Sequence, residues 1–136
     1  IMYLVRWYHK KYKNKIKGII LLQPTSPYRS LKKIIKMIKI FNNNKCKINY
    51  VSVSNTKKKN NMYLNKKNFL KLPSKINKAN CYINGNFYIL NVEKINNNTI
   101  ETIINSKTKG IMIKSKKMSL DIDTLENLKE ARNYIS

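Results

Sequence analysis

Apolar residues recur along the chain at spacings that predict alternating helices and strands. Residues 1–13 carry apolar side chains at helical spacing and predict an amphipathic helix. Residues 18–22, GIILL, form a continuous apolar run, as in the buried strands of parallel sheets. Ser30 is a good N-cap for a helix that has an apolar stripe on one side and lysines on the other. The stripe comprises Leu31, Ile34, Ile35, Ile38 and Phe41, and the lysines expected in water are Lys32, Lys33, Lys36 and Lys39.

The middle of the chain continues this alternation. Residues 47–54, KINYVSVS, predict a strand because β-branched residues alternate with polar ones. Strand, helix and strand at this spacing predict a βαβ unit with a right-handed crossover and a parallel sheet. Residues 61–72 predict a small hairpin that turns at 65–68. Residues 73–79 are polar and predict a loop or an arm.

The C-terminal third has the same organisation. Residues 81–91, CYINGNFYILN, predict a turn at Asn84 and Gly85 followed by an aromatic strand. Residues 96–106 predict a short helix, and residues 109–123 predict one or two strands. A last helix begins at Thr124, with an inner face made of Leu125, Leu128, Ala131 and Ile135. A chain of 136 residues is long enough for one domain, and these elements predict a single α/β domain.

The chain is strongly basic, with 29 Lys and Arg against 6 Asp and Glu and a net charge of +23. Such a balance indicates a nucleic acid or another polyanion as partner. However, only Arg6, Arg29 and Arg132 are arginine, and specific phosphate and base recognition relies on the guanidinium group. The lysines accompany many asparagines and isoleucines, whose codons are rich in A and T. We therefore expect a solvated surface and no nucleic-acid partner, and keep a basic polyanion-binding module as the alternative.

The cysteines, the histidine and the apolar runs narrow the class of protein further. Cys46 and Cys81 are the only cysteines, and the absence of a secretory signal predicts reduced thiols in a cytoplasmic protein. No apolar run approaches the roughly 18 residues of a membrane span, so no membrane association is expected. The single histidine, His9, lies among lysines and tyrosines and predicts a solvated helix residue.

The loop QPTSPYRS, residues 23–30, is the first candidate for chemistry. Ligands of open α/β sheets bind at the carboxyl ends of strands, and this loop leaves a predicted strand and meets a helix N-terminus. Gln23 supplies amide groups, and Thr25 and Ser26 supply hydroxyls. Pro24 and Pro27 stiffen the loop. The alternative interpretation is a turn followed by a helix cap.

The segment SLDIDT, residues 119–124, is the second candidate. Asp121 and Asp123 are two residues apart, so in extended backbone both carboxylates project to the same side. Paired carboxylates at a strand end suit Mg²⁺, which takes one or two protein oxygens and completes its shell with water and phosphate. The alternative is that Asp123 caps the last helix, with Glu126 as its capping-box partner.

Four segments in order resemble one enzyme family. GIILLQPTSPYRS, YVSVS, INGNFYI and SLDIDTLENLKEA are similar to the motif series of the acylneuraminate cytidylyltransferases, the CMP-N-acetylneuraminic acid synthetases. The similarity covers nearly the whole chain and corresponds to the C-terminal portion of such a synthetase. It implies a doubly wound, mostly parallel sheet of the nucleotide-diphospho-sugar transferase type, with the N-terminal part missing and residues 1–136 as one partial domain.

The resemblance also implies a reaction. The anomeric hydroxyl of a nine-carbon keto sugar acid, sialic acid or a relative, attacks the α-phosphorus of CTP, and the products are the CMP-sugar and pyrophosphate. Such an attack needs alignment and charge neutralisation more than covalent help. The resemblance implies Mg²⁺ as cofactor, a cytoplasmic location and a homodimer when the chain is full length.

Each family role is carried over by motif. Asp121 and Asp123 are the implied catalytic residues and would hold Mg²⁺ against the triphosphate. The implied substrate-binding residues are Gln23, Thr25, Ser26, Arg29, Asn84 and Tyr88. Gln23 would contact the sugar acid, with Thr25 and Ser26 lining the same loop. Arg29 is the best candidate for charge neutralisation, or else ties the loop down.

The chain also departs from the family pattern. The family's N-terminal glycine- and lysine-containing loop, which cradles the CTP phosphates, is absent. Tyr82 stands where an arginine is usual, Asn86 replaces an alanine, and Tyr28 replaces a leucine. We therefore expect marginal stability and no turnover of CTP by these 136 residues alone, and a catalytically inactive remnant of a synthetase is a further alternative.

Overall fold

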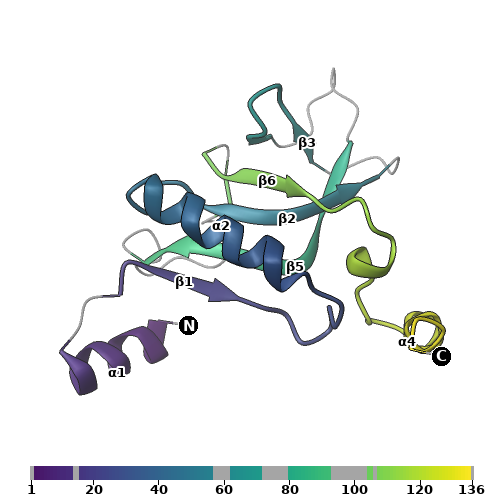
Figure 1. The fold of residues 1–136 in the computed structure, drawn as a ribbon, viewed down its shortest axis with the longest axis horizontal. Helices are drawn as coiled ribbons and strands as arrows, with labels where there is room; N and C mark the ends of the chain where they lie inside the picture. Colours follow the sequence, from purple (N-terminus) through teal and green to yellow (C-terminus); the bar gives the residue numbers. More distant parts are fainter. Residues whose placement is uncertain are drawn as a thin grey trace.

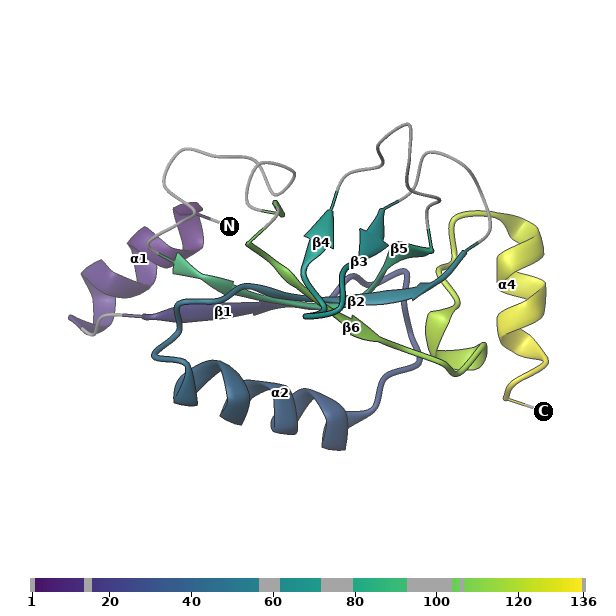
Figure 2. The ribbon, with the colours of Figure 1, turned by 90° about the horizontal axis from the view of Figure 1, so that it is seen from above.

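A mixed α/β arrangement is seen in the computed structural model, which describes residues 2–13, 16–56, 62–71, 80–92, 104–105 and 107–135 (Figure 1). Figure 2 shows α2 along one face of a four-stranded sheet and the β3–β4 hairpin over the other. The helices are α1 (Met2–Tyr12), α2 (Leu31–Asn43), the 3₁₀ helix η2 (Lys117–Ser119) and α4 (Leu125–Arg132). The strands are β1 (Gly18–Leu21), β2 (Tyr50–Asn55), β3 (Tyr63–Leu64), β4 (Leu70–Lys71), β5 (Cys81–Asn91) and β6 (Lys109–Met112).

The main sheet has the strand order β1-β5-β2-β6 and is mixed, so the expectation of a parallel sheet is wrong in part. β2 pairs in parallel with β6, but β5 is antiparallel to both of its neighbours, β1 and β2. β1 and β2 therefore run in the same direction, as a βαβ unit requires, with β5 inserted between them. The continuous apolar run of β1 did not reveal its place at the edge of the sheet, where the strand is only partly buried.

Helix α2 begins where the sequence predicts. The Ser30 side chain accepts a hydrogen bond from the backbone N–H of Lys33, which satisfies one free donor of the first turn. The buried stripe is narrower than predicted, because a straight helix on a sheet buries few rows of side chains: it consists of Ile34, Met37 and Phe41, whereas Leu31 and Ile35 are exposed. Lys33 is half-buried and donates to the Met112 carbonyl of β6, while Lys32, Lys36 and Lys39 are exposed.

The strands of the main sheet divide the buried side chains into two clusters, one on each face. Alternation along β2 sends Tyr50 toward α2, and Val51 and Val53 toward the hairpin. The cluster under α2 comprises Ile34, Met37, Phe41, Cys46, Tyr50, Phe87, Ile89 and Ile113. The cluster under the hairpin comprises Val51, Val53, Leu70, Cys81, Tyr88 and Leu90.

Strand β5 carries the feature that shapes the candidate site. Asn84 and Gly85 do not form the predicted turn, because they lie inside one continuous strand. The pairing with β2 shifts here: Val51 is opposite Tyr88 and Val53 is opposite Ile83, so two steps along β2 match five along β5. Gly85 has φ +70°, a left-handed conformation that glycine adopts without a side-chain clash.

The remaining predictions have mixed outcomes. The N-terminal helix and the small hairpin are confirmed. His9 is a helix residue, as predicted, but it is half-buried, and its Nε2 accepts a hydrogen bond from the Ile16 N–H at 2.9 Å. Both cysteines are free and buried. The arm predicted at 73–79 and most of the helix predicted at 96–106 lie outside the described residues.

The last helix also differs from its prediction. Thr124 is the N-cap and forms a capping box with Asn127, so the pairing of Asp123 with Glu126 is wrong. Ala131 is the buried residue of α4, whereas Leu125 and Ile135 are exposed. No helix in the described part of the chain is both long enough and apolar enough to cross a membrane.

Candidate functional site

Three segments that are far apart in the sequence meet at one end of the sheet. They are the loop after β1 (residues 22–30), the irregular part of β5 (residues 84–86), and the stretch between η2 and α4 (residues 120–124). The N–H of Ile122 donates to the Thr25 carbonyl at 2.8 Å, which holds the first segment against the third. The amide loop and the acidic segment, the two candidates from the sequence, therefore lie side by side (Figure 1).

Ser26 lies at the centre of the three segments. Its side chain is fully buried, and its hydroxyl is 3.1 Å from the carbonyl oxygen of Asn84 and 3.2 Å from Oδ1 of Asp121. The loop around it is a turn in which the Ser26 N–H donates to the Gln23 carbonyl at 3.1 Å. Ser26 therefore faces protein on all sides and does not line an open surface.

Asn84 is also buried, at 1% exposure, and both ends of its amide have partners. Its Nδ2 donates to the Ser54 hydroxyl at 2.7 Å, and its Oδ1 accepts from the Asn86 N–H at 3.2 Å. The Ser54 hydroxyl lies 2.6 Å from that of Ser119 in η2, two residues before Asp121. Asn84 thus belongs to a chain of hydrogen bonds inside the protein.

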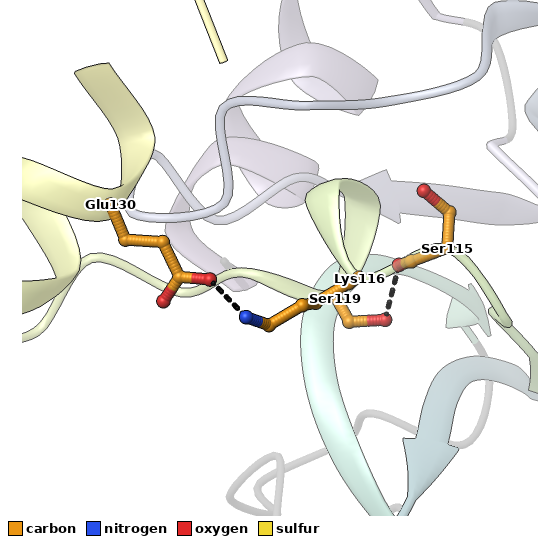
Figure 3. A network of polar contacts seen from close by, with 4 residues as sticks. All are labelled: Ser115, Lys116, Ser119 and Glu130. Carbon is orange, nitrogen blue, oxygen red and sulfur yellow. Dashed lines mark hydrogen bonds and ion pairs between the residues drawn. The ribbon is translucent and has the colours of Figure 1, made fainter. Parts of the chain in front are cut away.

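The 3₁₀ helix η2 fixes the start of the acidic segment (Figure 3). The Ser119 hydroxyl donates to the Ser115 carbonyl at 2.8 Å. Lys116 pairs with Glu130 of α4 at 3.0 Å, but 84% of the lysine side chain is exposed, so this ion pair adds little stability. The hydrogen bonds of the Ser119 hydroxyl, more than the ion pair, hold the backbone that leads to Asp121.

Asn86 joins the β1 loop to η2, a role that we did not predict from the sequence. Its side-chain amide donates to the Tyr28 carbonyl at 2.7 Å and to the Met118 carbonyl at 2.9 Å. Its own carbonyl accepts from Nε of Arg29 at 2.9 Å. The asparagine that replaces the family's usual alanine was the available signal, since a buried amide needs several partners.

Arg29 uses its guanidinium group on the main chain. Besides the bond to Asn86, its Nη2 donates to the Gln23 carbonyl. Burial lowers the pKa of Arg29 from its ordinary value, and the nearby Asp121 carboxylate opposes that shift. These contacts are those of a residue that ties the loop down, which was the second of the two roles expected for it.

Gln23 is half-buried, and Tyr88, which contacts it, is buried at 6% exposure. The Tyr88 hydroxyl donates to Oε1 of Gln23 at 3.4 Å. Burial raises the pKa of the Tyr88 phenol, and the negative charge of Asp121 raises it further. A Cβ on Gly85 would lie 1.9 Å from the same Gln23 oxygen, so the missing side chain of Gly85 is what allows the amide to lie against β5.

The two carboxylates are in different surroundings. Asp121 is half-buried beside Ser26, whereas Asp123 is exposed. Among the described residues, no group of three or more His, Cys, Asp and Glu side chains could hold a metal ion. Mg²⁺ needs only one or two carboxylates when water and phosphate complete its shell, so Asp121 and Asp123 fit this ion as a donor set.

An apolar hollow of about 370 Å³ lies elsewhere, between α1 and β1. Its lining comprises Leu4, Val5, Trp7, Tyr8, Ile16, Ile19, Ile20 and Leu21. Small-molecule sites usually combine an apolar wall with a few convergent polar groups, and this lining includes no charged residue. The polar groups converge instead around Ser26, which makes that region the better candidate site.

Comparisons with known proteins add no assignment. Neither the protein-family models nor the curated proteins gave a significant match to the sequence.

Proposed function

We propose that this protein is a nucleotidyltransferase that couples CTP to a nonulosonic acid, sialic acid or a relative, and releases the CMP-sugar and pyrophosphate. The observation that carries the proposal is the junction of the amide loop with the acidic segment, through the Thr25 carbonyl and the Ser26 hydroxyl. This junction supports the proposal because a metal bound by the carboxylates would then lie beside a sugar acid bound by the loop.

The reaction replaces one phosphorus–oxygen bond with another. The anomeric oxygen of the sugar acid bonds to the α-phosphorus of CTP, the bond from that phosphorus to the bridging oxygen breaks with pyrophosphate as the leaving group, and the proton of the attacking hydroxyl passes to solvent water. Asp121 and Asp123 would hold Mg²⁺, which neutralises phosphate charge when bound. The side chains of Gln23 and Thr25 are half-buried and in reach of a ligand, and they would orient the sugar acid. Tyr88 would support Gln23 through its hydroxyl.

The same proposal includes the finer fold, the nucleotide-diphospho-sugar transferase type of doubly wound sheet. In its support, β1, β2 and β6 share one direction, and α2 connects β1 to β2 across one face. A cytoplasmic location and a homodimeric full-length protein are also part of the proposal.

Isothermal titration with CTP, Mg²⁺ and sialic acid tests this function. We expect CTP binding that requires Mg²⁺ and that Asp121→Asn weakens at least tenfold. Glu126→Gln is the matched control, because Glu126 is an exposed carboxylate of the adjoining helix. Single-stranded DNA is titrated in parallel at several salt concentrations. DNA binding that falls steeply with salt, without Mg²⁺-dependent CTP binding, would favour a polyanion-binding module.

A further inference from the structure

The family resemblance assigns Ser26 and Asn84 to the substrate, but their burial excludes direct contact with one. Ser26 is 0% exposed and Asn84 is 1% exposed. Their neighbours in sequence differ: Gln23 and Thr25 are half-buried. The loop thus separates into side chains that can reach a ligand and a side chain that reaches only protein.

We propose that Ser26 is a positioning residue that fixes the direction of the Asp121 carboxylate; its consequence for metal binding rests on the proposed function. The hydroxyl has one proton and two acceptors at similar distances, the Asn84 carbonyl at 3.1 Å and Asp121 Oδ1 at 3.2 Å. A hydrogen bond to an ionised oxygen is the stronger of the two kinds. The Ser26 hydroxyl therefore donates its proton to Asp121, and this hydrogen bond holds Oδ1 in one place.

The serine can hold a carboxylate only if it is itself fixed, and two backbone hydrogen bonds fix it. Its N–H is bound to the Gln23 carbonyl at 3.1 Å. The carbonyl of Thr25, the preceding residue, accepts from Ile122, the residue after Asp121, at 2.8 Å. Two adjacent residues of the loop thus contact two adjacent residues of the acidic segment. Thr25 binds Ile122 through the backbone, and Ser26 binds Asp121 through its side chain.

Asn84 completes this support from β5. Its carbonyl is the second acceptor of Ser26, and its side chain continues through Ser54 to Ser119, which lies two residues before Asp121. The acidic segment is consequently held on both sides of Asp121, by Ser119 of this network before it and by the Ile122 N–H, bound to the Thr25 carbonyl, after it. Asn84, like Ser26, acts through Asp121 and not on the sugar.

Without the Ser26 hydroxyl, Asp121 should sample more than one side-chain rotamer, and a metal ion would have to order it on binding. Partners that orient metal ligands are worth about tenfold to a hundredfold in metal affinity. We therefore expect Ser26→Ala to weaken Mn²⁺ binding by that factor, measured by water-proton relaxation in the presence of CTP. The three-bond couplings of the Asp121 β-protons, measured by NMR, should change from one rotamer to an average.

Ser52→Ala is the matched control. Ser52 is also 0% exposed, and its hydroxyl makes two hydrogen bonds, to the Phe87 carbonyl at 3.1 Å and from the Phe87 N–H at 2.9 Å. It has no contact with Asp121, so its loss should lower stability and leave the couplings and the Mn²⁺ affinity unchanged. If Ser26→Ala does not fold, Ser26→Cys keeps the size of the side chain with a weaker donor and should shift the couplings in the same direction.

The couplings of the Asp121 β-protons test whether Ser26 positions Asp121. The Mn²⁺ titration tests the proposed nucleotidyltransferase function. A single Asp121 rotamer in the folded Ser26 variants, equal to that of the wild type, overturns the proposal. Averaged couplings in a protein that binds no Mn²⁺ with or without CTP would support the positioning of Asp121 by Ser26 and refute the nucleotidyltransferase.

Discussion

Gly85 is the position where the smallest substitution should have the largest effect. A Cβ at this residue would lie 1.9 Å from Gln23 Oε1 and 2.9 Å from Ser26 Oγ, and its φ of +70° disfavours any L side chain. Gly85→Ala therefore imposes backbone strain and steric overlap at once. Gln23 can swing its amide away, but it then loses the hydrogen bond from Tyr88. Ser26 is fully buried and has little room to move.

The loss of stability in Gly85→Ala follows from the backbone strain and the steric overlap. The left-handed conformation costs an alanine about 1–2 kcal/mol, and overpacking at a filled site costs about 1–3 kcal/mol more. We expect the free energy of unfolding to fall by about 2–5 kcal/mol, which is a large fraction of the stability of a small domain. The substitution should also weaken CTP and sialic acid binding, because Gln23 must leave its place.

Urea unfolding followed by far-UV circular dichroism measures the loss. Gly110→Ala is the control: its Cβ would lie 2.5 Å from Leu64 Cδ2, the flexible end of a side chain, and its φ is not positive. Adding Gln23→Ala to Gly85→Ala should recover the part that comes from overlap with Gln23 and leave the parts that come from backbone strain and from overlap with Ser26. If Gly85→Ala costs no more than Gly110→Ala, the crowded, left-handed arrangement of β5 is wrong.

Two further predictions concern single buried groups. Arg29→Met removes hydrogen bonds to the carbonyls of Gln23 and Asn86 and should lower the free energy of unfolding by about 1–3 kcal/mol. The control Arg132→Met changes an exposed residue and should alter this free energy by less than about 0.5 kcal/mol. Equal losses for the two variants in urea unfolding would contradict the role of Arg29 in holding the loop. Burial raises the pKa of the Cys81 thiol from 9.0 to about 11, so the unfolded chain loses this proton at lower pH than the folded chain. The stability that this group contributes is complete below pH 9 and lost as the pH rises toward 11. A wild-type unfolding free energy that declines no more over this range than that of Cys81→Ala would show that the thiol is not buried.

Local patterns predicted most elements because their causes are local. Ser30 caps α2 through its own side chain, and β3 pairs with β4 only a few residues along the chain. The width of the buried stripe on α2 does not follow from local sequence, because it depends on which side of the helix the sheet covers. That side carries Ile34, Met37 and Phe41, and it leaves Leu31 and Ile35 exposed. Similarly, a continuous apolar run at 18–21 is compatible with a central strand or an edge strand, and only the pairing of β1 with β5 distinguishes them.

In the candidate site, too, some features follow from the local sequence and others only from tertiary packing. The residue types and the resemblance to known motifs indicated Gln23, Ser26 and Asp121 as candidate site residues. Spacing could not tell which of these side chains is buried, since Ser26 and Thr25 are adjacent and of similar chemistry. Asn84 and Gly85 form a turn-like dipeptide whose usual role is to reverse the chain, yet here they continue a strand.

The sequence by itself determined the approximate positions of α1, β1, α2, β2, the β3–β4 hairpin and α4, the free thiols and the two polar segments that could carry chemistry. These depend on periodicity, capping and composition, which act over a few residues. The tertiary structure decided the insertion of β5 between β1 and β2, the burial of Ser26 and Asn84, and the use of Arg29 on main-chain carbonyls. Each of these depends on which distant segment satisfies a buried polar group, and that choice is made only when the whole chain packs.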